Sequence, residues 1–152
     1  MKSERPGDKV SESRPSIVIL AGPNGAGKST VAPDVLQGTL AVGEFVNADV
    51  IASGLSAFDL FFLWLSSADL AVERVAERVA SGGHNVPADT IRRRYRAGIR
   101  NFFHLYQPIV TSWTLYNASG PEPMLVAESL ESEPMKVYDR GVWAAVQRQA
   151  NE

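Results

Sequence analysis

The residues whose types and spacing most clearly support chemistry form a glycine-rich run, GPNGAGKS, from Gly22 to Ser29. It satisfies the pattern G-x4-G-K-[ST], in which backbone amides turn inward around phosphate groups. Glycine permits such turns because it has no Cβ atom. The chemistry of the motif gives Lys28 to the β- and γ-phosphates and the Ser29 hydroxyl to Mg²⁺. We therefore predict that this run binds ATP or GTP together with Mg²⁺.

The predicted nucleotide-binding residues all come from this loop and from the start of the helix expected after it. They are Gly22, Asn24, Gly25, Ala26, Gly27, Lys28, Ser29 and Thr30. Of these, Ser29 is the one predicted to contact the metal ion, through the bound nucleotide.

A carboxylate is expected near the same phosphate loop. The segment Glu44 to Asp49 is predicted to be a strand, and it ends in Asp49. Ligands of open α/β sheets bind at the carboxyl ends of the strands. Asp49 could therefore accept the proton of a substrate hydroxyl, or hold Mg²⁺ through water. The alternative is that Asp49 caps the segment after it.

Arginines are dense in the second half of the chain. Arg74 and Arg78 are one helical turn apart, and five more arginines follow between residues 92 and 100. Phosphoryl transfer needs movable positive charge, which arginine supplies as a planar, permanently charged fork. We expect an arginine-bearing lid around residues 74–101. Two alternatives remain open, namely a solvated helix face whose arginines pair with Glu73, Glu77 and Asp89, and a nucleic-acid-binding helix.

The elements that must position these side chains alternate between strands and helices. Apolar runs predict strands at residues 16–21, 44–49, 60–65, 113–116 and 124–127. Helical periodicity predicts helices at residues 29–37, 67–80, 87–106 and 142–149. This alternation is typical of an α/β fold with helices around a largely parallel sheet.

Length and composition favour one domain. The chain has 152 residues, of which 45% are hydrophobic and 21% charged. Residues 1–15 are polar and are expected to form a disordered leader before a single domain at 16–152. The net charge of -2 gives no reason to expect nucleic acid or membrane as a partner. No secretion signal and no membrane-spanning run is visible, and cysteine is absent, so we expect a cytoplasmic protein.

Two large classes of phosphate-loop protein fit poorly. Transporter-type ATPases share the wording GPNGAGKST, but they need a full LSGGQ-like signature and an acidic pair after a buried strand. Here only Ser81-Gly82-Gly83 resembles that signature, and Ser66-Ser67 follows the apolar run. GTPases need N-K-x-D and D-x-x-G motifs, which the sequence lacks. A small kinase with a mobile lid remains.

The chain resembles the zeta-toxin-like family of P-loop kinases, in particular the bacterial branch often labelled "predicted ABC-type ATPase". The matching stretches cover most of residues 16–127. They are IVILAGPNGAGKST (17–30), FVNAD (45–49), LFFLWL (60–65), RVAERVASGGHNVP (74–87), IRRRY (91–95) and WTLYNASGPEP (113–123).

The resemblance implies a nucleoside-monophosphate-kinase-like fold and a transfer of the γ-phosphate of ATP. The carried-over catalytic roles fall on Asp49 as the base and on Arg78, Arg93 and Arg94 as lid arginines. Characterised zeta toxins resemble sugar kinases that phosphorylate UDP-N-acetylglucosamine, and an antitoxin neutralises them. The implied partners are therefore a nucleotide, a small-molecule substrate and an antitoxin protein.

One departure from the family is visible between the two middle strands. Family members carry a helix, a strand and a second helix there, whereas this chain has only Val50 to Asp59. We therefore expect a sheet short of one central strand. The alternative function is a catalytically impaired, nucleotide-binding relative that acts as an interaction module.

Overall fold

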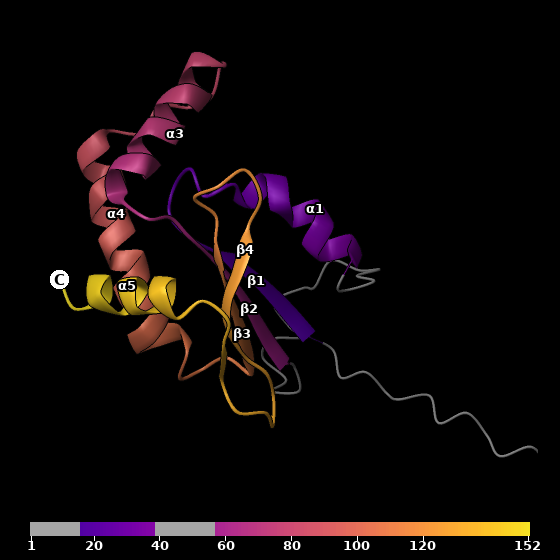
Figure 1. Cartoon of the computed structure of the whole chain (residues 1–152). Coiled ribbons are helices and arrows are strands. Elements are labelled where there is room, and N and C mark those ends of the chain that lie inside the picture. The colour runs from indigo at the N-terminus through magenta and orange to yellow at the C-terminus, as the bar shows by residue number, and fades with distance from the viewer. Residues whose placement is uncertain (1–15, 39–56) are drawn as a thin grey trace, which may run out of the picture.

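The computed structural model describes residues 16–38 and 57–152, which fold as helices around a sheet (Figure 1). The strands are β1 (Ser16–Ala21), β2 (Ala57–Trp64), β3 (Ser112–Asn117), β4 (Met124–Ser129) and β5 (Lys136–Val137). The helices are α1 (Lys28–Gly38), α3 (Ala68–Ala80), α4 (Ala88–Asn101), the π-helical turn η1 (Phe102–Tyr106) and α5 (Arg140–Ala150). Within these two ranges no helix is long and apolar enough to cross a membrane.

The five strands form one mixed sheet in the order β1-β2-β3-β4-β5. The first three are parallel, and both β3–β4 and β4–β5 are antiparallel pairs. The expected α/β class is confirmed, but the expectation of a parallel sheet is wrong for β4 and β5. The reason is the length of the connections, because parallel neighbours need a crossover of about a dozen residues or more. Only residues 118–123 separate β3 from β4.

Several predicted elements have somewhat different bounds in the structure. β2 begins at Ala57, three residues before the apolar run, and α5 begins at Arg140 because Asp139 caps it by accepting a hydrogen bond from the Val142 amide. The helix expected through residue 106 is α-helical only to Asn101 and then continues as η1. β5 was not predicted, because two residues are too few to show a hydrophobic period.

The core lies between the sheet and the helices α4, η1 and α5. Alternate residues of β2 point toward it, among them Leu60 and Phe62, which are almost fully buried. The Phe62 ring lies 4.7 Å from that of Phe102, whose ring lies 5.3 Å from Trp113. Figure 1 shows α4 and α5 together on one side of the sheet, with α1 on the other side, beyond β1. The core of the protein thus lies mainly on the α4–α5 side of the sheet.

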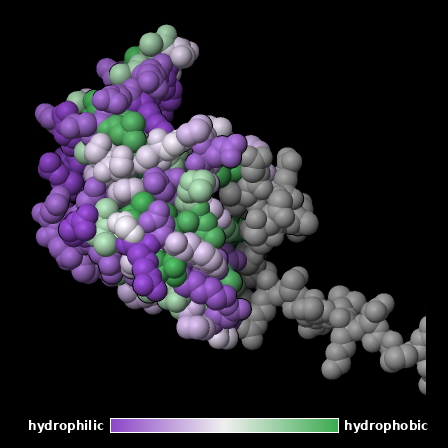
Figure 2. Space-filling view, viewed as in Figure 1, coloured by the Kyte–Doolittle hydropathy of each residue, from purple (hydrophilic) through white to green (hydrophobic). Residues whose placement is uncertain are grey.

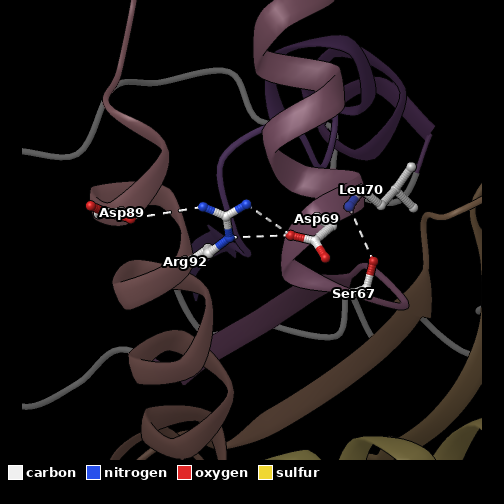
Figure 3. A network of polar contacts seen from close by, with 5 residues as sticks. All are labelled: Ser67, Asp69, Leu70, Asp89 and Arg92. Carbon is white, nitrogen blue, oxygen red and sulfur yellow. Dashed lines mark hydrogen bonds and ion pairs between the residues drawn. The ribbon is translucent and has the colours of Figure 1, made fainter.

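Helices α3 and α4 form a hairpin that extends beyond the sheet. Arg92 of α4 donates to the Asp69 carboxylate of α3 at 3.1 Å through both Nε and Nη2, and it also lies 3.8 Å from Asp89 (Figure 3). Ser67 caps α3 by accepting a hydrogen bond from the Leu70 amide. The outer surface of this hairpin is mainly hydrophilic (Figure 2). The pairing of Arg92 with Asp89 agrees with the interpretation of this arginine as part of a solvated, ion-paired face.

Some sequence predictions lie outside the described residues. These are the leader at residues 1–15, the strand at 44–49 with Asp49, and the connection from residue 50 to 56. The expected loss of a central strand concerns the same part of the chain and remains a prediction.

Candidate functional site

The loop between β1 and α1 turns sharply because three of its glycines have positive φ angles. Gly22, Gly25 and Gly27 have φ values of 144°, 82° and 80°. A Cβ atom at Gly22 would lie 2.4 Å from the Leu63 carbonyl oxygen, and one at Gly25 would lie 2.9 Å from the Arg74 Cβ. Glycine at these two positions therefore lets the loop approach β2 and α3 closely.

Helix α1 begins immediately after this turn. The amides of Thr30 and Val31 donate to the Gly27 carbonyl at 2.9 Å and 3.0 Å and so start the helix. Ala26 is 2% exposed and anchors the loop in the core. The first turn of a helix carries unsatisfied amides and a partial positive charge, which favour an anion. Ser29 and Thr30, both exposed, flank this end.

Lys28 folds back over the loop. Its ammonium group donates to the carbonyl oxygens of Gly22 at 2.8 Å and Pro23 at 2.9 Å. Burial lowers the pKa of Lys28 from its ordinary value, and the nearby positive charge of Arg78 lowers it further. Both effects disfavour the charged ammonium, so an anion placed between these two cations would be stabilised.

A pocket of about 480 Å³ opens in front of the loop and α1. It is lined by Asn24, Gly25, Gly27, Lys28, Ser29, Thr30, Arg74 and Arg78. Three of these side chains are cationic, and none of the lining residues in the described part of the chain is a carboxylate. The pocket has the size and the charge to hold a polyphosphate.

Arg78 lines this pocket from the last turn of α3. The Gly83 amide donates to the Arg78 carbonyl and the Gly82 amide to the Val79 carbonyl, each at 2.9 Å. With Gly82 at φ 91°, these bonds form a Schellman motif. The chain then folds back so that the Arg78 Nη2 donates to the His84 carbonyl at 3.2 Å. The exposed guanidinium has donors left for a ligand.

Arg74, one turn earlier on α3, is bonded much more extensively. Its Nη1 donates to the Ala118 carbonyl at 2.6 Å and to the Gly25 carbonyl at 3.4 Å. Its Nη2 donates to the carbonyls of Ser119 and Gly120 at 2.8 Å and 3.3 Å. Arg74 therefore connects the loop between β1 and α1 to the turn that follows β3.

That turn forms the wall of a second pocket, of about 400 Å³. The turn is held in place by the Ala118 amide, which donates to the Trp64 carbonyl, and by the Ser119 hydroxyl, which accepts from the Ser66 amide. The pocket is lined by Ala26, Gly27, Thr30, Val31, Arg74, Ala118, Gly120, Pro121, Glu122 and Pro123. Gly27, Thr30 and Arg74 line both pockets, so the two adjoin.

A third pocket, of about 310 Å³, lies on the sheet face turned away from α4 and α5. Its lining includes the carboxylates of Asp59 and Glu128, which accept hydrogen bonds from Ser112 and Tyr138. Negative charge there opposes the binding of phosphate groups. The pocket beside the loop between β1 and α1 is therefore the better candidate for the functional site.

The structure brings only some of the predicted site residues together. Of the predicted lid arginines, Arg78 lines the pocket, whereas Arg93 and Arg94 are exposed on α4 and do not line it. Gly22 and Ala26 shape the loop without lining this pocket. Asp49 lies outside the described residues. The catalytic roles of Asp49, Arg78, Arg93 and Arg94 remain predictions.

Two features of the site were missed from the sequence. Arg74 was noted as lying one helical turn from Arg78. That its guanidinium would bond the loop to the turn after β3 depends on how α3 packs, which the sequence does not show. Residues 118–123 entered the sequence analysis only within the stretch WTLYNASGPEP, and nothing there marked them as a pocket wall, because they contribute mainly backbone carbonyls and prolines.

No protein-family model and no curated protein sequence matches this chain. A chain in the crystal structure of AvrRxo1-ORF1:AvrRxo1-ORF2 with sulphate ions does match its fold. The match has a TM-score of 0.59 and 14% sequence identity, and it covers 90% of this chain and 64% of that chain. This chain thus spans less than two thirds of the matched chain's length. At this identity the match shows a shared fold.

Proposed function

We propose that this chain binds the polyphosphate of ATP or GTP with Mg²⁺ and transfers the γ-phosphate to a hydroxyl of a small molecule, as in the zeta-toxin-like kinases that its motifs resemble. The observation that carries the proposal is the convergence of Lys28 and Arg78 on one pocket at the start of α1. The absence of a carboxylate from the described lining leaves these charges available for an anionic ligand.

The individual residues then have distinct tasks. The first amides of α1 and the Lys28 ammonium hold the β- and γ-phosphates. Ser29, exposed at the same helix end, would hold Mg²⁺, which neutralises charge on the transferring group. Arg78 stabilises the equatorial oxygens of the γ-phosphate from the α3 side. The second pocket adjoins the first and would take the nucleoside.

The transfer step itself needs a base. Asp49 is the candidate, and it would accept the proton of the substrate hydroxyl as the new O–P bond forms. The bond between the γ-phosphorus and its bridging oxygen breaks, and the nucleoside diphosphate leaves with the electron pair. A UDP-N-acetyl sugar is the substrate that the resemblance favours.

A non-catalytic relative is the second candidate function. The observation that favours it is the short connection, since only residues 50–56 separate the predicted Asp49 strand from β2. Such a protein would bind nucleotide with the same loop but would form no phosphorylated product.

The test of binding is calorimetric titration of wild type and Lys28→Ala with Mg–ATP and Mg–GTP. The variant should lose at least about tenfold in affinity, because it removes a charge-assisted contact of about 1.5–3 kcal/mol. Lys136→Ala is the matched control, since this surface lysine pairs with Glu133 and should not affect binding. Equal affinity in wild type and Lys28→Ala would reject the proposed site.

The test of catalysis is mass spectrometry after incubation with Mg–ATP and UDP-N-acetylglucosamine. A product heavier by one phosphoryl group, absent with Lys28→Ala and Asp49→Asn, supports the kinase. Nucleotide binding with no turnover of ATP against this substrate or other sugar nucleotides supports the second candidate instead.

A further inference from the structure

Arg74 is bonded in a way that differs from the other cation of α3. Its two terminal nitrogens direct hydrogen bonds to four carbonyl oxygens on two separate segments of the chain. Arg78, by contrast, makes one such bond within residues 16–38 and 57–152, to the His84 carbonyl. The two arginines are neighbours on the pocket wall, but the terminal nitrogens of Arg74 are already bonded, whereas most donors of Arg78 are left for a ligand.

The donor count explains why Arg74 is poorly suited to bind phosphate directly. The two terminal nitrogens of a guanidinium carry four N–H groups, and four carbonyls already accept from them. If the Arg74 guanidinium turned toward a phosphate, these carbonyls would lose their hydrogen bonds. The new contacts with the phosphate would have to offset that loss of free energy. Arg74 is therefore a structural cation within an anion-binding site.

The segments that Arg74 joins belong to different pockets. Gly25 is part of the phosphate loop and lines the first pocket, whereas Ala118 and Gly120 line the second. Among the described residues, the other hydrogen bonds hold only the near end of the second segment, at the amides of Ala118 and Ser119 and at the Ser119 hydroxyl. Gly120 is tied toward the phosphate loop through Arg74, at 3.3 Å.

We propose that Arg74 is a positioning residue that couples the two pockets, so that a nucleoside in the second pocket and phosphates in the first bind cooperatively. The proposal rests on the proposed function, because it assumes that one nucleotide fills both pockets. Loss of the four Arg74 hydrogen bonds releases the pocket wall at residues 120–123 and weakens the contribution of the nucleoside to binding affinity. Lys28 and the start of α1 still hold the phosphates.

The experiment compares two ligands, Mg–ATP and inorganic tripolyphosphate with Mg²⁺, in wild type and Arg74→Lys. The dissociation constant of tripolyphosphate divided by that of Mg–ATP measures how much the nucleoside adds to binding. In Arg74→Lys this ratio should fall by about tenfold toward one, which is within the usual range of coupling between sites. The affinity for tripolyphosphate should stay within about twofold of wild type. Lysine retains the positive charge but cannot donate hydrogen bonds to all four carbonyls at once.

Two further variants make the comparison specific. Arg78→Lys should weaken ATP and tripolyphosphate alike, and Arg148→Lys, exposed on α5 and outside both pockets, should change neither. An unchanged ratio in Arg74→Lys overturns the coupling, and so does an equal weakening of both ligands. Failure of wild type to bind either ligand would instead reject the proposed function itself.

A measurement on wild type tests the same coupling without any substitution. Tripolyphosphate alone should slow amide hydrogen exchange in residues 118–122 as well as in the phosphate loop, because Arg74 transmits the ordering. Protection confined to residues 22–31 would overturn the proposal, even if an Arg74 variant failed to fold.

Discussion

Gly22 and Gly27 of the loop between β1 and α1 meet different physical demands. Gly22 lies against the backbone of β2, where a Cβ atom would come within 2.4 Å of the Leu63 carbonyl oxygen. Gly27 has a positive φ as well, but a Cβ there would meet nothing within 4 Å. The first position therefore combines a steric demand with a conformational one, and the second has only the conformational demand.

The contrast gives a prediction about stability. Gly27→Ala should lower the free energy of unfolding by about 1 kcal/mol, the usual cost of a non-glycine residue at positive φ. Gly22→Ala should cost more, about 3 kcal/mol or above, because β2 must also move. Urea unfolding of the ligand-free variants measures both. Equal losses would mean that the loop and β2 are not in close contact.

Tyr95 gives a prediction about pH. Its hydroxyl donates to the Leu65 carbonyl at 2.6 Å, and burial raises the pKa of Tyr95 from 10.0 to about 12. The unfolded chain therefore loses this proton first, and stability falls as the pH rises from about 10 to about 12. Below pH 10 the protonated Tyr95 hydroxyl makes its full contribution to the stability of the fold.

The measurement is the melting temperature of wild type and Tyr95→Phe across this pH range. Other lysines and tyrosines titrate in both proteins, so the difference between the two isolates Tyr95. The gap between their melting temperatures should narrow from pH 10 to pH 12. A constant gap would contradict the raised pKa.

At the scale of single residues, the sequence predicted the loop but not the use of the arginines. Gly22 to Ser29 could be recognised because local spacing alone defines the motif. The four arginines look alike in the sequence, namely Arg74, Arg78, Arg93 and Arg94. They differ in whether their side of the helix is turned toward the pocket or toward solvent. That direction depends on how α3 and α4 pack on the rest of the molecule, which a local pattern does not contain.

Among the elements, α3 is the one whose ends are best defined. Ser67 accepts the Leu70 amide at its start, and the Schellman motif with Gly82 closes its end. Both signals were readable, and the predicted range of 67–80 differs from α3 only by the cap itself. Such helix ends are predictable because their causes lie within a few residues.

Removing the cap should loosen α3 measurably. Ser67→Ala is expected to lower the free energy of unfolding by about 1 kcal/mol, because the Leu70 amide loses its acceptor. Ser81→Ala is the matched control at the other end of α3, where the serine hydroxyl only donates to the Glu77 carbonyl in an exposed position. Thermal unfolding of the two variants checks this, and a larger loss in Ser81→Ala would contradict the role of Ser67.

The elements that could not be predicted have causes elsewhere in the fold. The change from α4 to the π-helical η1 keeps Phe102 in the aromatic core, and no residue in the local sequence marks it. β5 exists because Ala127 and Glu128 of β4 offer it a pairing edge. Both depend on tertiary contacts, which override local propensity.

Across the whole molecule, Gln149 connects elements far apart in the sequence. Its side-chain oxygen accepts from the Trp64 Nε1 at 2.8 Å, and its amide donates to the Ser66 carbonyl at 3.0 Å. The same oxygen lies 3.0 Å from the Tyr95 hydroxyl, whose single proton it shares with the closer Leu65 carbonyl. It thereby holds α5 against the end of β2 and against α4. No pattern in the sequence singles out this residue from its neighbours.

Gln149→Ala should therefore destabilise the protein by about 1–3 kcal/mol, because it leaves the largely buried Trp64 Nε1 without its acceptor. Gln147→Ala, on the exposed side of the same helix, is the matched control and should stay within about 0.5 kcal/mol. Chemical denaturation of both variants decides the matter. Equal losses would show that α5 is held by its apolar face alone.

The α/β class was predictable at this scale because apolar strands alternate with amphipathic helices. The mixed topology was harder, since the direction of β4 depends on a six-residue connection whose ends had first to be located. Strand order within the sheet has no local signature at all.

The three tryptophans of the chain all lie where α5 meets the sheet. Trp113 and Trp143 stack with ring centroids 5.7 Å apart and an angle of 9° between planes, and Trp64 bonds to Gln149. Indole emission and the near-ultraviolet circular dichroism of the stacked pair should thus report selectively on the docking of α5. The chain carries an optical probe of its C-terminal helix, which needs no added label.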